Sequence, residues 1–152
     1  MLGSGAYSTV FKVKRINDGE IYALKSKLKI TKEVNLSGLR EKERLNALNE
    51  VRILASISHP NIIAYKDSFI YENSLCIIME YADGGDLANL IETKKKAQTL
   101  FLEKEIWEIF LQILTGLNAL HELKTLHRDL KTANIFIHKG IVKLGDLNVS
   151  KV

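Results

Sequence analysis

Two short polar motifs near the end of the chain contain residues suited to moving a phosphoryl group from ATP to a hydroxyl. The first motif, HRDLKTANIF, covers residues 127–136, and the second, GDLN, covers residues 145–148. Together they place an acid, a lysine, an asparagine and a second acid in the order that this reaction requires. Asp129 can accept the proton of an attacking hydroxyl, and Asn134 and Asp146 offer the hard oxygen ligands that Mg²⁺ prefers. The two motifs therefore predict ATP-dependent phosphoryl transfer.

His-Arg-Asp alone has a simpler explanation, because three common polar residues also occur in solvated loops in which an aspartate holds a turn. The match, however, extends from His127 through Phe136 and on to Asp146. Each further residue at a fixed spacing makes coincidence less plausible. We therefore favour the catalytic interpretation over the solvated loop.

A glycine-rich segment near the N-terminus, GSGAYSTV at residues 3–10, is the first candidate for phosphate binding. Glycines let the backbone approach phosphates closely and present its N–H groups to them. An ordinary hairpin turn is the alternative. The next residues favour the phosphate interpretation, because they predict a strand over 10–15, a turn at 17–19 and a second strand over 20–26.

On the second of these strands, Ala23 and Lys25 share one face, while Tyr22 and Leu24 point to the other. A small residue can lie beside a flat ligand, and an ammonium two positions on can lie beside its phosphates. A lone strand lysine is usually just solvated. The register nevertheless predicts Lys25 as the phosphate-binding lysine.

An amphipathic helix is predicted next, from the apolar stripe of Leu45, Leu48, Val51 and Leu54 among charged residues. Glu50 lies in this helix. An isolated helical glutamate is normally exposed to solvent. Here we predict instead an ion pair of Glu50 with Lys25, which would hold the lysine on the phosphates.

The middle of the chain predicts elements that position these motifs. A strand is expected over 75–80, followed by a turn and a helix that begins at Leu87 with Asp86 as its cap. Two short strands, over 135–137 and 141–144, would deliver Asp146 to the site. A long helix over 103–123 carries apolar residues on one side, which are predicted to be core positions, and Trp107 is expected to pack as well. The core positions are Ile106, Phe110, Ile113, Leu114, Leu117 and Leu120.

Composition predicts a folded intracellular protein: of 152 residues, 46% are hydrophobic and 26% charged. The single cysteine, Cys76, lies in an apolar run and is expected to be a packed thiol. No uncharged run approaches membrane-spanning length, and the N-terminus is not a signal peptide, so we expect a cytoplasmic or nuclear protein without a membrane partner. The net charge of +4 includes 18 acidic residues spread among the basic ones, so no nucleic-acid partner is expected. Lys94, Lys95 and Lys96 are predicted to be a solvated helix end.

These motifs resemble those of eukaryotic protein kinases, and within them the NIMA-related (Nek) serine/threonine kinases. The subfamily resemblance rests on ALNEVRILASISHPNIIAYKDSF, MEYADGGDL, HRDLKTANIF and LGDLNVSKV. It implies an α+β fold of two lobes that clasp ATP. Residues 1–79 would form the β-rich small lobe, 80–86 the hinge region and 87–152 the first part of the helical large lobe.

The resemblance also implies roles for individual residues. Asp129, Lys131, Lys25 and Glu50 would be catalytic, with Lys131 neutralising the transferred phosphoryl group. Asn134 and Asp146 would bind Mg²⁺. The hinge backbone would hold adenine, Val10, Ala23 and Phe136 would sandwich it, and Met79 would guard the pocket behind. The nucleotide site as a whole would consist of Leu2, Gly3, Ser4, Gly5, Val10, Ala23, Lys25, Met79, Glu80, Ala82 and Phe136. An arginine at the position of Arg128 is typical of kinases that are controlled by phosphorylation, so the resemblance implies such control here. The partners would be ATP and a protein with Ser/Thr hydroxyls.

Two features depart from the family pattern. Asp146-Leu147-Asn148 replaces Asp-Phe-Gly, which keeps the acid, an apolar middle residue and a residue that tolerates left-handed backbone. The chain begins at the glycine-rich segment and ends at Val152, so we expect a fragment whose isolated activity is weak and whose 103–123 helix lacks cover. A non-catalytic nucleotide-binding or interaction module, a truncated pseudokinase, is the alternative. The resemblance suggests nuclear, centrosomal or ciliary association, and the residues indicate neither a particular substrate nor an oligomeric state.

Overall fold

The computed structural model describes residues 1–5, 8–27, 51–72, 74–147 and 150–151. The chain divides into two compact units. The first unit consists of Met1–Ser56 and Ala64–Tyr81, and the second of Ile57–Ile63 and Ala82–Val152. Glu50, Leu45, Leu48 and Asn148 lie outside the described residues, so the predictions that concern them stay predictions.

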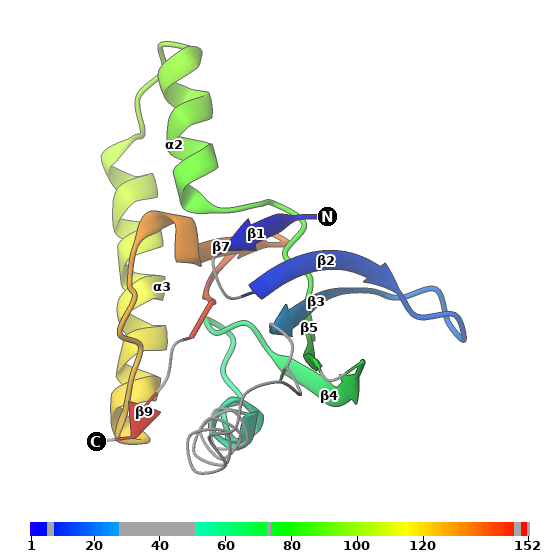
Figure 1. Ribbon diagram of the computed structural model, residues 1–152. Coiled ribbons are helices and arrows are strands. Elements are labelled where there is room, and N and C mark those ends of the chain that lie inside the picture. The colour runs from blue at the N-terminus through cyan, green and yellow to red at the C-terminus, as the bar shows by residue number, and fades with distance from the viewer. Residues whose placement is uncertain (6–7, 28–50, 73, 148–149, 152) are drawn as a thin grey trace. The chain divides into compact units, whose positions relative to one another are not determined.

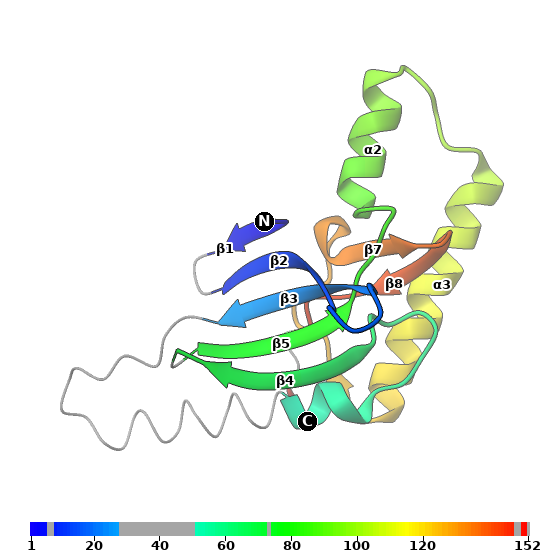
Figure 2. The ribbon, with the colours of Figure 1, turned by 90° about the vertical axis from the view of Figure 1, so that its right-hand side faces the viewer.

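The first unit contains a five-stranded antiparallel sheet in the order β1-β2-β3-β5-β4 (Figure 2). Its strands are β1 (Gly3–Gly5), β2 (Ser8–Lys14), β3 (Ile21–Lys27), β4 (Tyr65–Tyr71) and β5 (Ser74–Glu80). The predicted strands over 10–15, 20–26 and 75–80 are confirmed, with bounds that differ by one or two residues. The glycine-rich segment itself forms β1 and the start of β2.

The β2–β3 turn forms as its Asn-Asp-Gly sequence predicts. Gly19 has a left-handed backbone with φ of 78° and donates its N–H to the Arg15 carbonyl at 2.9 Å. Asp18 accepts from the Glu20 N–H at 3.1 Å and forms an ion pair with Arg15. Glycine suits such a φ because it has no Cβ to clash with the backbone.

In the interior of this sheet, Cys76 and Ile77 of β5 are buried, 5% and 1% exposed. The expectation that Cys76 is a packed thiol is therefore confirmed. Residues 51–56 are helical, which agrees with the part of the predicted helix that the structure describes.

Among its described residues, the second unit contains two α-helices, two pairs of short strands and two isolated bridges between single residues (Figure 1). Its elements are α2 (Leu87–Lys96), α3 (Glu103–Glu122), β6 (Thr125–Leu126), a 3-10 turn (Thr132–Asn134), β7 (Ile135–His138), β8 (Ile141–Leu144) and β9 (Ser150–Lys151). β7 pairs with β8, β6 pairs with β9, and Ile62 forms a parallel bridge with Leu144. The helices in one unit and the main sheet in the other confirm the predicted α+β class.

The start of α2 is capped as the sequence predicts. The Asp86 carboxylate accepts from the backbone N–H of Asn89 at 2.8 Å and from its side-chain amide at 2.6 Å. A side-chain acceptor at this position satisfies a backbone donor that has no partner within the helix.

The core of the second unit forms where the segment 57–63 contacts β8 and α3. Ile62, Leu120 and Leu144 are at most 1% exposed. The Leu144 N–H donates to the Asn61 carbonyl at 2.8 Å, and the Ile63 N–H donates to the Leu144 carbonyl at 2.8 Å. Gly116 of α3 lies so close that an added Cβ would be 2.6 Å from the Asn61 oxygen. The segment thus completes the outer edge of β8.

The prediction that the apolar side of α3 is core is wrong for several of its residues. Ile106, Phe110 and Leu114 are 53%, 45% and 42% exposed, whereas Leu120 is fully buried. Trp107 is 54% exposed and contacts Phe110 edge-on, with ring centroids 5.9 Å apart. The periodicity correctly indicates one apolar side, but only the C-terminal part of that side meets a partner among the described residues. The separate expectation that this helix lacks cover agrees with these exposures.

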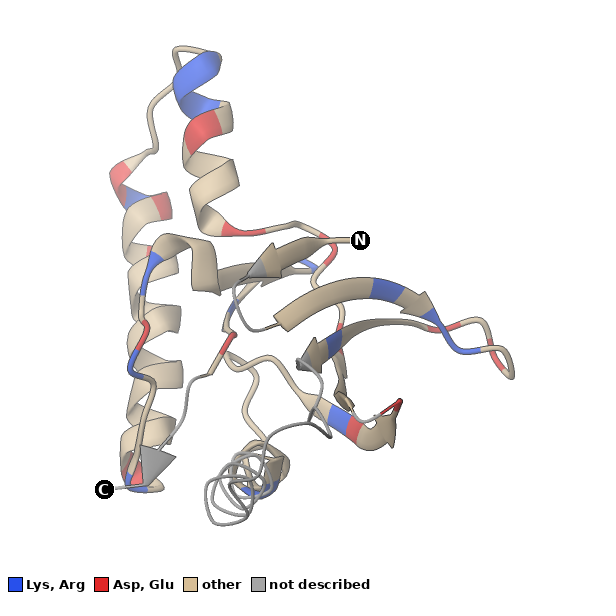
Figure 3. Ribbon diagram, viewed as in Figure 1, with Lys and Arg blue, Asp and Glu red and all other residues tan. Residues whose placement is uncertain are grey.

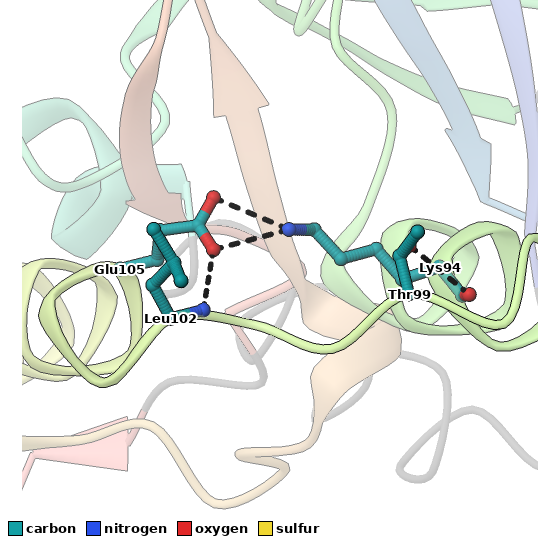
Figure 4. A network of polar contacts seen from close by, with 4 residues as sticks. All are labelled: Lys94, Thr99, Leu102 and Glu105. Carbon is teal, nitrogen blue, oxygen red and sulfur yellow. Dashed lines mark hydrogen bonds and ion pairs between the residues drawn. The ribbon is translucent and has the colours of Figure 1, made fainter.

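The lysines at the end of α2 differ from one another, so the prediction of a solvated helix end is right for Lys95 and wrong for Lys94. Lys95 is 77% exposed. Lys94 instead binds both carboxylate oxygens of Glu105, at 3.2 and 3.1 Å, and lies 4.5 Å from the ring centroid of Phe101 (Figure 4). Glu105 also accepts the Leu102 N–H at 2.7 Å. Lys94 therefore ties the end of α2 to the start of α3.

Basic and acidic residues are interspersed along the described ribbon of each unit (Figure 3). Among the described residues, no helix combines the length and the apolar composition needed to cross a bilayer.

Candidate active site

His127, buried at 3% exposure, anchors the loop that carries the predicted catalytic residues. The Asp129 N–H donates to its Nδ1 at 3.3 Å, across Arg128, whose φ is 68°. Burial lowers the pKa of His127, and the nearby carbonyl of Gly145 and the charges of Asp129 and Asp146 oppose this effect. A neutral imidazole has an unprotonated nitrogen, which is what the Asp129 N–H requires as an acceptor.

Asp129 is held by two side chains that lie close to it in the sequence. Asn134 donates its Nδ2 to the Asp129 carbonyl at 2.8 Å and to carboxylate Oδ2 at 2.9 Å. Lys131 donates its Nζ to the same Oδ2 at 2.8 Å. Both donors converge on Oδ2, and Oδ1 makes no hydrogen bond to a described residue. The arrangement fixes the carboxylate and leaves one oxygen for an incoming hydroxyl.

The same contacts favour the ionised form of Asp129. The hydrogen bond from Lys131, followed by that from Asn134, lowers the pKa of Asp129 below its usual value, against the opposing effect of desolvation. In return Asp129 raises the pKa of Lys131, and the charge of Asp146 contributes to this increase. Asp129 is thus ionised and Lys131 cationic at neutral pH. A carboxylate whose pKa is lowered is a weaker base, so it suits a reaction in which orienting the hydroxyl matters more than removing its proton early.

The two predicted metal ligands meet through the backbone. The Gly145 N–H, immediately before Asp146, donates to the Asn134 carbonyl at 2.9 Å. The Asn134 side chain uses its nitrogen on Asp129, and its Oδ1 accepts no hydrogen bond from a described residue. Asp146 is half-buried with φ of 50°. An amide oxygen and a carboxylate are donors that fit Mg²⁺, which commonly takes one or two protein oxygens and completes its shell with phosphates and water.

Phe136, the predicted floor of the adenine site, packs directly against the loop that carries Asp146. A Cβ added to Gly145 would lie 2.6 and 2.7 Å from two ring carbons of Phe136, and 3.0 Å from a carbon of Ile63. Glycine is therefore required at this position for the ring to approach. The contact links the predicted base-binding residue to the predicted metal ligand.

In the first unit, the strand register brings five predicted nucleotide-binding residues onto one face of the sheet. Gly3 pairs with Val10, Val10 with Lys25, and Ala23 with Met79. Because directly paired residues share a face and alternate residues along a strand do so too, all five lie on the same face. Lys25 is buried, at 8% exposure. Lys25 therefore lies on the opposite face of β3 from Tyr22 and Leu24, as the sequence predicts.

Most of the remaining predicted site residues lie in or beside strands of the first unit. Leu2 donates its N–H to the Val10 carbonyl at 2.8 Å, and Ser4 and Gly5 pair with β2. Glu80 donates its N–H to the Ala64 carbonyl at 2.9 Å and accepts the Ala64 N–H on its carboxylate at 3.1 Å. Ala82 begins the second unit after Tyr81. Leu147, the apolar middle residue of the Asp-Leu-Asn motif, is buried at 5% exposure.

Some residues near the site were not identified from the sequence. Asp83 contacts His138, and Asn61 contacts Gln112, across 55 and 51 positions of sequence. Asn61 donates to the Val142 carbonyl at 2.9 Å, while Gln112 accepts the Val142 N–H at 2.9 Å, so both hold β8. No pattern in the sequence links these positions. Each of these residues is polar, and polar residues are common in turns and on helix surfaces without any distant partner.

Comparison with known proteins supplies the family. The protein kinase domain matches over residues 1–152. Mouse serine/threonine-protein kinase Nek1 is 41% identical over 99% of this chain, human Nek11 is 38% identical over 99%, and zebrafish Nek8 is 42% identical over 100%. The chain spans 12%, 23% and 21% of the length of these relatives.

Proposed function

The chain belongs to the protein kinase domain family, with similarity to the Nek kinases, and we propose that it supplies the ATP-binding and catalytic-loop portion of a serine/threonine protein kinase. The reaction would transfer the γ-phosphoryl group of ATP to a Ser or Thr hydroxyl of a protein substrate. The observation that supports this most strongly is the convergence of Asn134 and Lys131 on one oxygen of Asp129.

Asp129 would orient the substrate hydroxyl with its uncommitted oxygen and accept the proton as the new phosphate ester forms. Lys131, held next to it, would place a positive charge where the transferred group gains negative charge. This arrangement needs no strong base, since most of the effect comes from position and charge rather than from proton affinity. The lowered pKa of Asp129 agrees with such a role.

Mg²⁺ when bound would neutralise the phosphate oxygens, with the side-chain oxygens of Asn134 and Asp146 as its protein ligands. On the face of the first sheet, Lys25 would bind the phosphates, and Val10 and Ala23 would contact the base together with Phe136. Glu80 and Ala82 would offer backbone groups to adenine. The assignment of Glu50 as the partner of Lys25 stays a prediction, as do the cytoplasmic location and the expected associations.

The first test is binding of a non-hydrolysable ATP analogue to the 152-residue chain, measured by calorimetry with and without Mg²⁺. We expect affinity that depends on Mg²⁺ and that Lys25→Met reduces strongly. Lys14→Met, an exposed lysine on the adjacent strand, is the matched control and should bind as the wild type does. Absence of binding by the wild type would contradict the proposal.

The second test separates an enzyme from a non-catalytic module. Phosphate transfer from labelled ATP to a general protein substrate is compared between wild type and Asp129→Asn in the protein that contains this chain. We expect Asp129→Asn to bind the nucleotide and lose transfer, because only the group that orients the hydroxyl is altered. Equal transfer by both proteins would exclude Asp129 as the catalytic residue.

A further inference from the structure

The segment 83–86, immediately after the predicted adenine-binding residues, runs alongside β7 and pairs with it through its backbone. The Gly84 N–H donates to the Ile137 carbonyl at 2.9 Å, and the Ile137 N–H donates to the Gly85 carbonyl at 2.9 Å. Asp86 and Phe136 form an antiparallel bridge. This segment therefore lies against the strand that carries Phe136.

A side-chain contact closes the outer end of this pairing. One oxygen of Asp83, Oδ1, contacts His138 Nδ1 at 3.1 Å and accepts the Lys139 N–H at 2.9 Å. Lys139 and Gly140 have φ of 49° and 80°, the left-handed pair that a two-residue hairpin turn requires. The turn directs the Lys139 N–H toward Asp83, so a single carboxylate binds both the side chain and the backbone of the β7–β8 turn.

The backbone at Gly84 packs tightly against Ile137, so it has little room to move. A Cβ added to Gly84 would lie 2.9 Å from Ile137 Cγ2 and 3.0 Å from both the Cβ and the carbonyl oxygen of that residue. Few exposed ion pairs contribute measurably to stability, and the Asp83 side chain is 54% exposed. The Asp83–His138 pair differs from other exposed pairs in its position. It lies between the backbone hydrogen bonds that join segment 83–86 to β7 and the β7–β8 turn, whose residues Lys139 and Gly140 have left-handed backbone.

The position of the contact relates it to the nucleotide. Phe136 is two residues before His138, and its ring packs on Gly145, next to the predicted metal ligand Asp146. Ala82 is one residue before Asp83. The Asp83–His138 contact thus fixes the backbone that follows the predicted hinge to the strand that carries the predicted base floor.

We propose that Asp83 and His138 are positioning residues for nucleotide binding, because their contact clamps segment 83–86 to β7 and holds Phe136 in place beneath the base. The proposal rests on the proposed function, since it assigns Phe136 to the adenine site. A clamp of this kind raises affinity by keeping the binding-competent arrangement populated before the nucleotide arrives.

The test measures the affinity of Mg-ADP by calorimetry for wild type and four variants. Asp83→Ala and His138→Ala should each weaken binding about two- to ten-fold, the range expected from losing one or two hydrogen bonds. Asp83→Asn keeps an acceptor oxygen at the same place and should restore affinity to near the wild-type value. Glu108→Gln, which removes an exposed ion pair with Lys104 on α3, is the matched control and should bind as the wild type does.

A second readout, which needs no nucleotide, distinguishes a local clamp from a general loss of stability. In Asp83→Ala, amide hydrogen exchange should accelerate at Gly84, Ile137 and Lys139 and stay unchanged at Ile63 and Leu144, which belong to another part of the same unit. Unchanged affinity in Asp83→Ala and His138→Ala, or equal acceleration at all five amides, would overturn the proposal. Failure of the wild type to bind Mg-ADP would instead contradict the proposed function itself.

Discussion

The side-chain nitrogen of Asn134 holds Asp129 at two points at once, the backbone carbonyl at 2.8 Å and the carboxylate at 2.9 Å. Asn134 is 5% exposed, so neither contact competes with much water. The residue predicted as a metal ligand is thus also the residue that fixes the orientation of the predicted catalytic carboxylate. Its loss should affect both functions.

Asn134→Ala should lower kcat by about a hundred-fold or more, the lower end of what a positioned acid–base group contributes. The Asp129 carboxylate would lose one of its two donors, and the metal would lose an oxygen ligand. Steady-state kinetics with varied Mg²⁺ would measure both effects. Asn118→Ala removes an exposed asparagine that contacts Glu122 on α3 and is the control. Equal kcat in the two variants would show that Asn134 has no part in catalysis.

Lys131→Met should raise the pKa of Asp129, because the hydrogen bond from Lys131 is the largest cause of its lowered value. The sign follows from the charges: removing a cation makes the carboxylate harder to ionise. Titration of the Asp129 carboxyl carbon by NMR would follow the change without depending on activity. Lys95→Met, which alters an exposed lysine of α2, is the control and should leave the pKa of Asp129 unchanged.

The same shift links stability to pH. Because the folded state holds the pKa of Asp129 below its usual value, this group stabilises the fold at pH values above its unfolded pKa. That contribution is lost as the pH falls through the folded-state pKa. Lys131→Met should therefore flatten the fall of stability in acid, which denaturant titrations at several pH values would detect. An identical pH dependence in wild type and variant would contradict this interpretation.

Gly116→Ala should destabilise the protein by about 1–3 kcal/mol, the usual consequence of overfilling a packed interior. The new methyl group would lie 2.6 Å from the backbone oxygen of Asn61 and 3.2 Å from Leu144. A backbone oxygen can move away only if the segment 57–63 shifts. Urea unfolding would give the free energy, and Thr115→Ala, exposed on the same helix, should change it little. A stability equal to that of the wild type would mean that the segment moves freely.

The two sides of α3 should respond differently to substitution. Leu120→Ala, at a fully buried position, should lower the free energy of unfolding by about 2–5 kcal/mol. Leu111→Gln, at a position 56% exposed, should change it by no more than about 0.5 kcal/mol. Leu111→Gln should also reduce self-association, which sedimentation would measure, because exposed apolar surface promotes contacts between molecules. A large loss of stability in Leu111→Gln would show that this side of the helix is covered in solution.

Local features of the fold could be predicted from the sequence. The Asp86 cap, the β2–β3 turn and the β7–β8 pairing each depend on residues a few positions apart, and their chemistry selects one conformation. The face of Lys25 follows from the alternation of a strand. The motif also placed Lys131 and Asn134 within five positions of Asp129, although their hydrogen bonds to its carboxylate became apparent only in the structure.

Contacts between distant segments could not be predicted in this way. Asp83 and His138 are 55 positions apart, and either would suit an exposed loop equally well. The exposure of Phe110 shows the same limit, because helical periodicity indicates which side is apolar but not what covers it. Contacts between distant residues and the exposure of a helix face both depend on how the elements pack against one another. Local sequence patterns do not specify this packing.

The segment 57–63 makes the second unit discontinuous along the chain, and this affects how the protein can be synthesised and divided. Asn61 and Ile63 are made long before Leu144, yet their hydrogen bonds complete the outer edge of β8. On the ribosome, the second unit therefore cannot close until β8 has emerged, whatever the first unit has done by then. A cut at the boundary between Tyr81 and Ala82 would leave residues 82–152 with an unpaired strand edge, which a strand from another molecule could occupy. A peptide of residues 57–63 supplied in trans is the natural occupant of that edge.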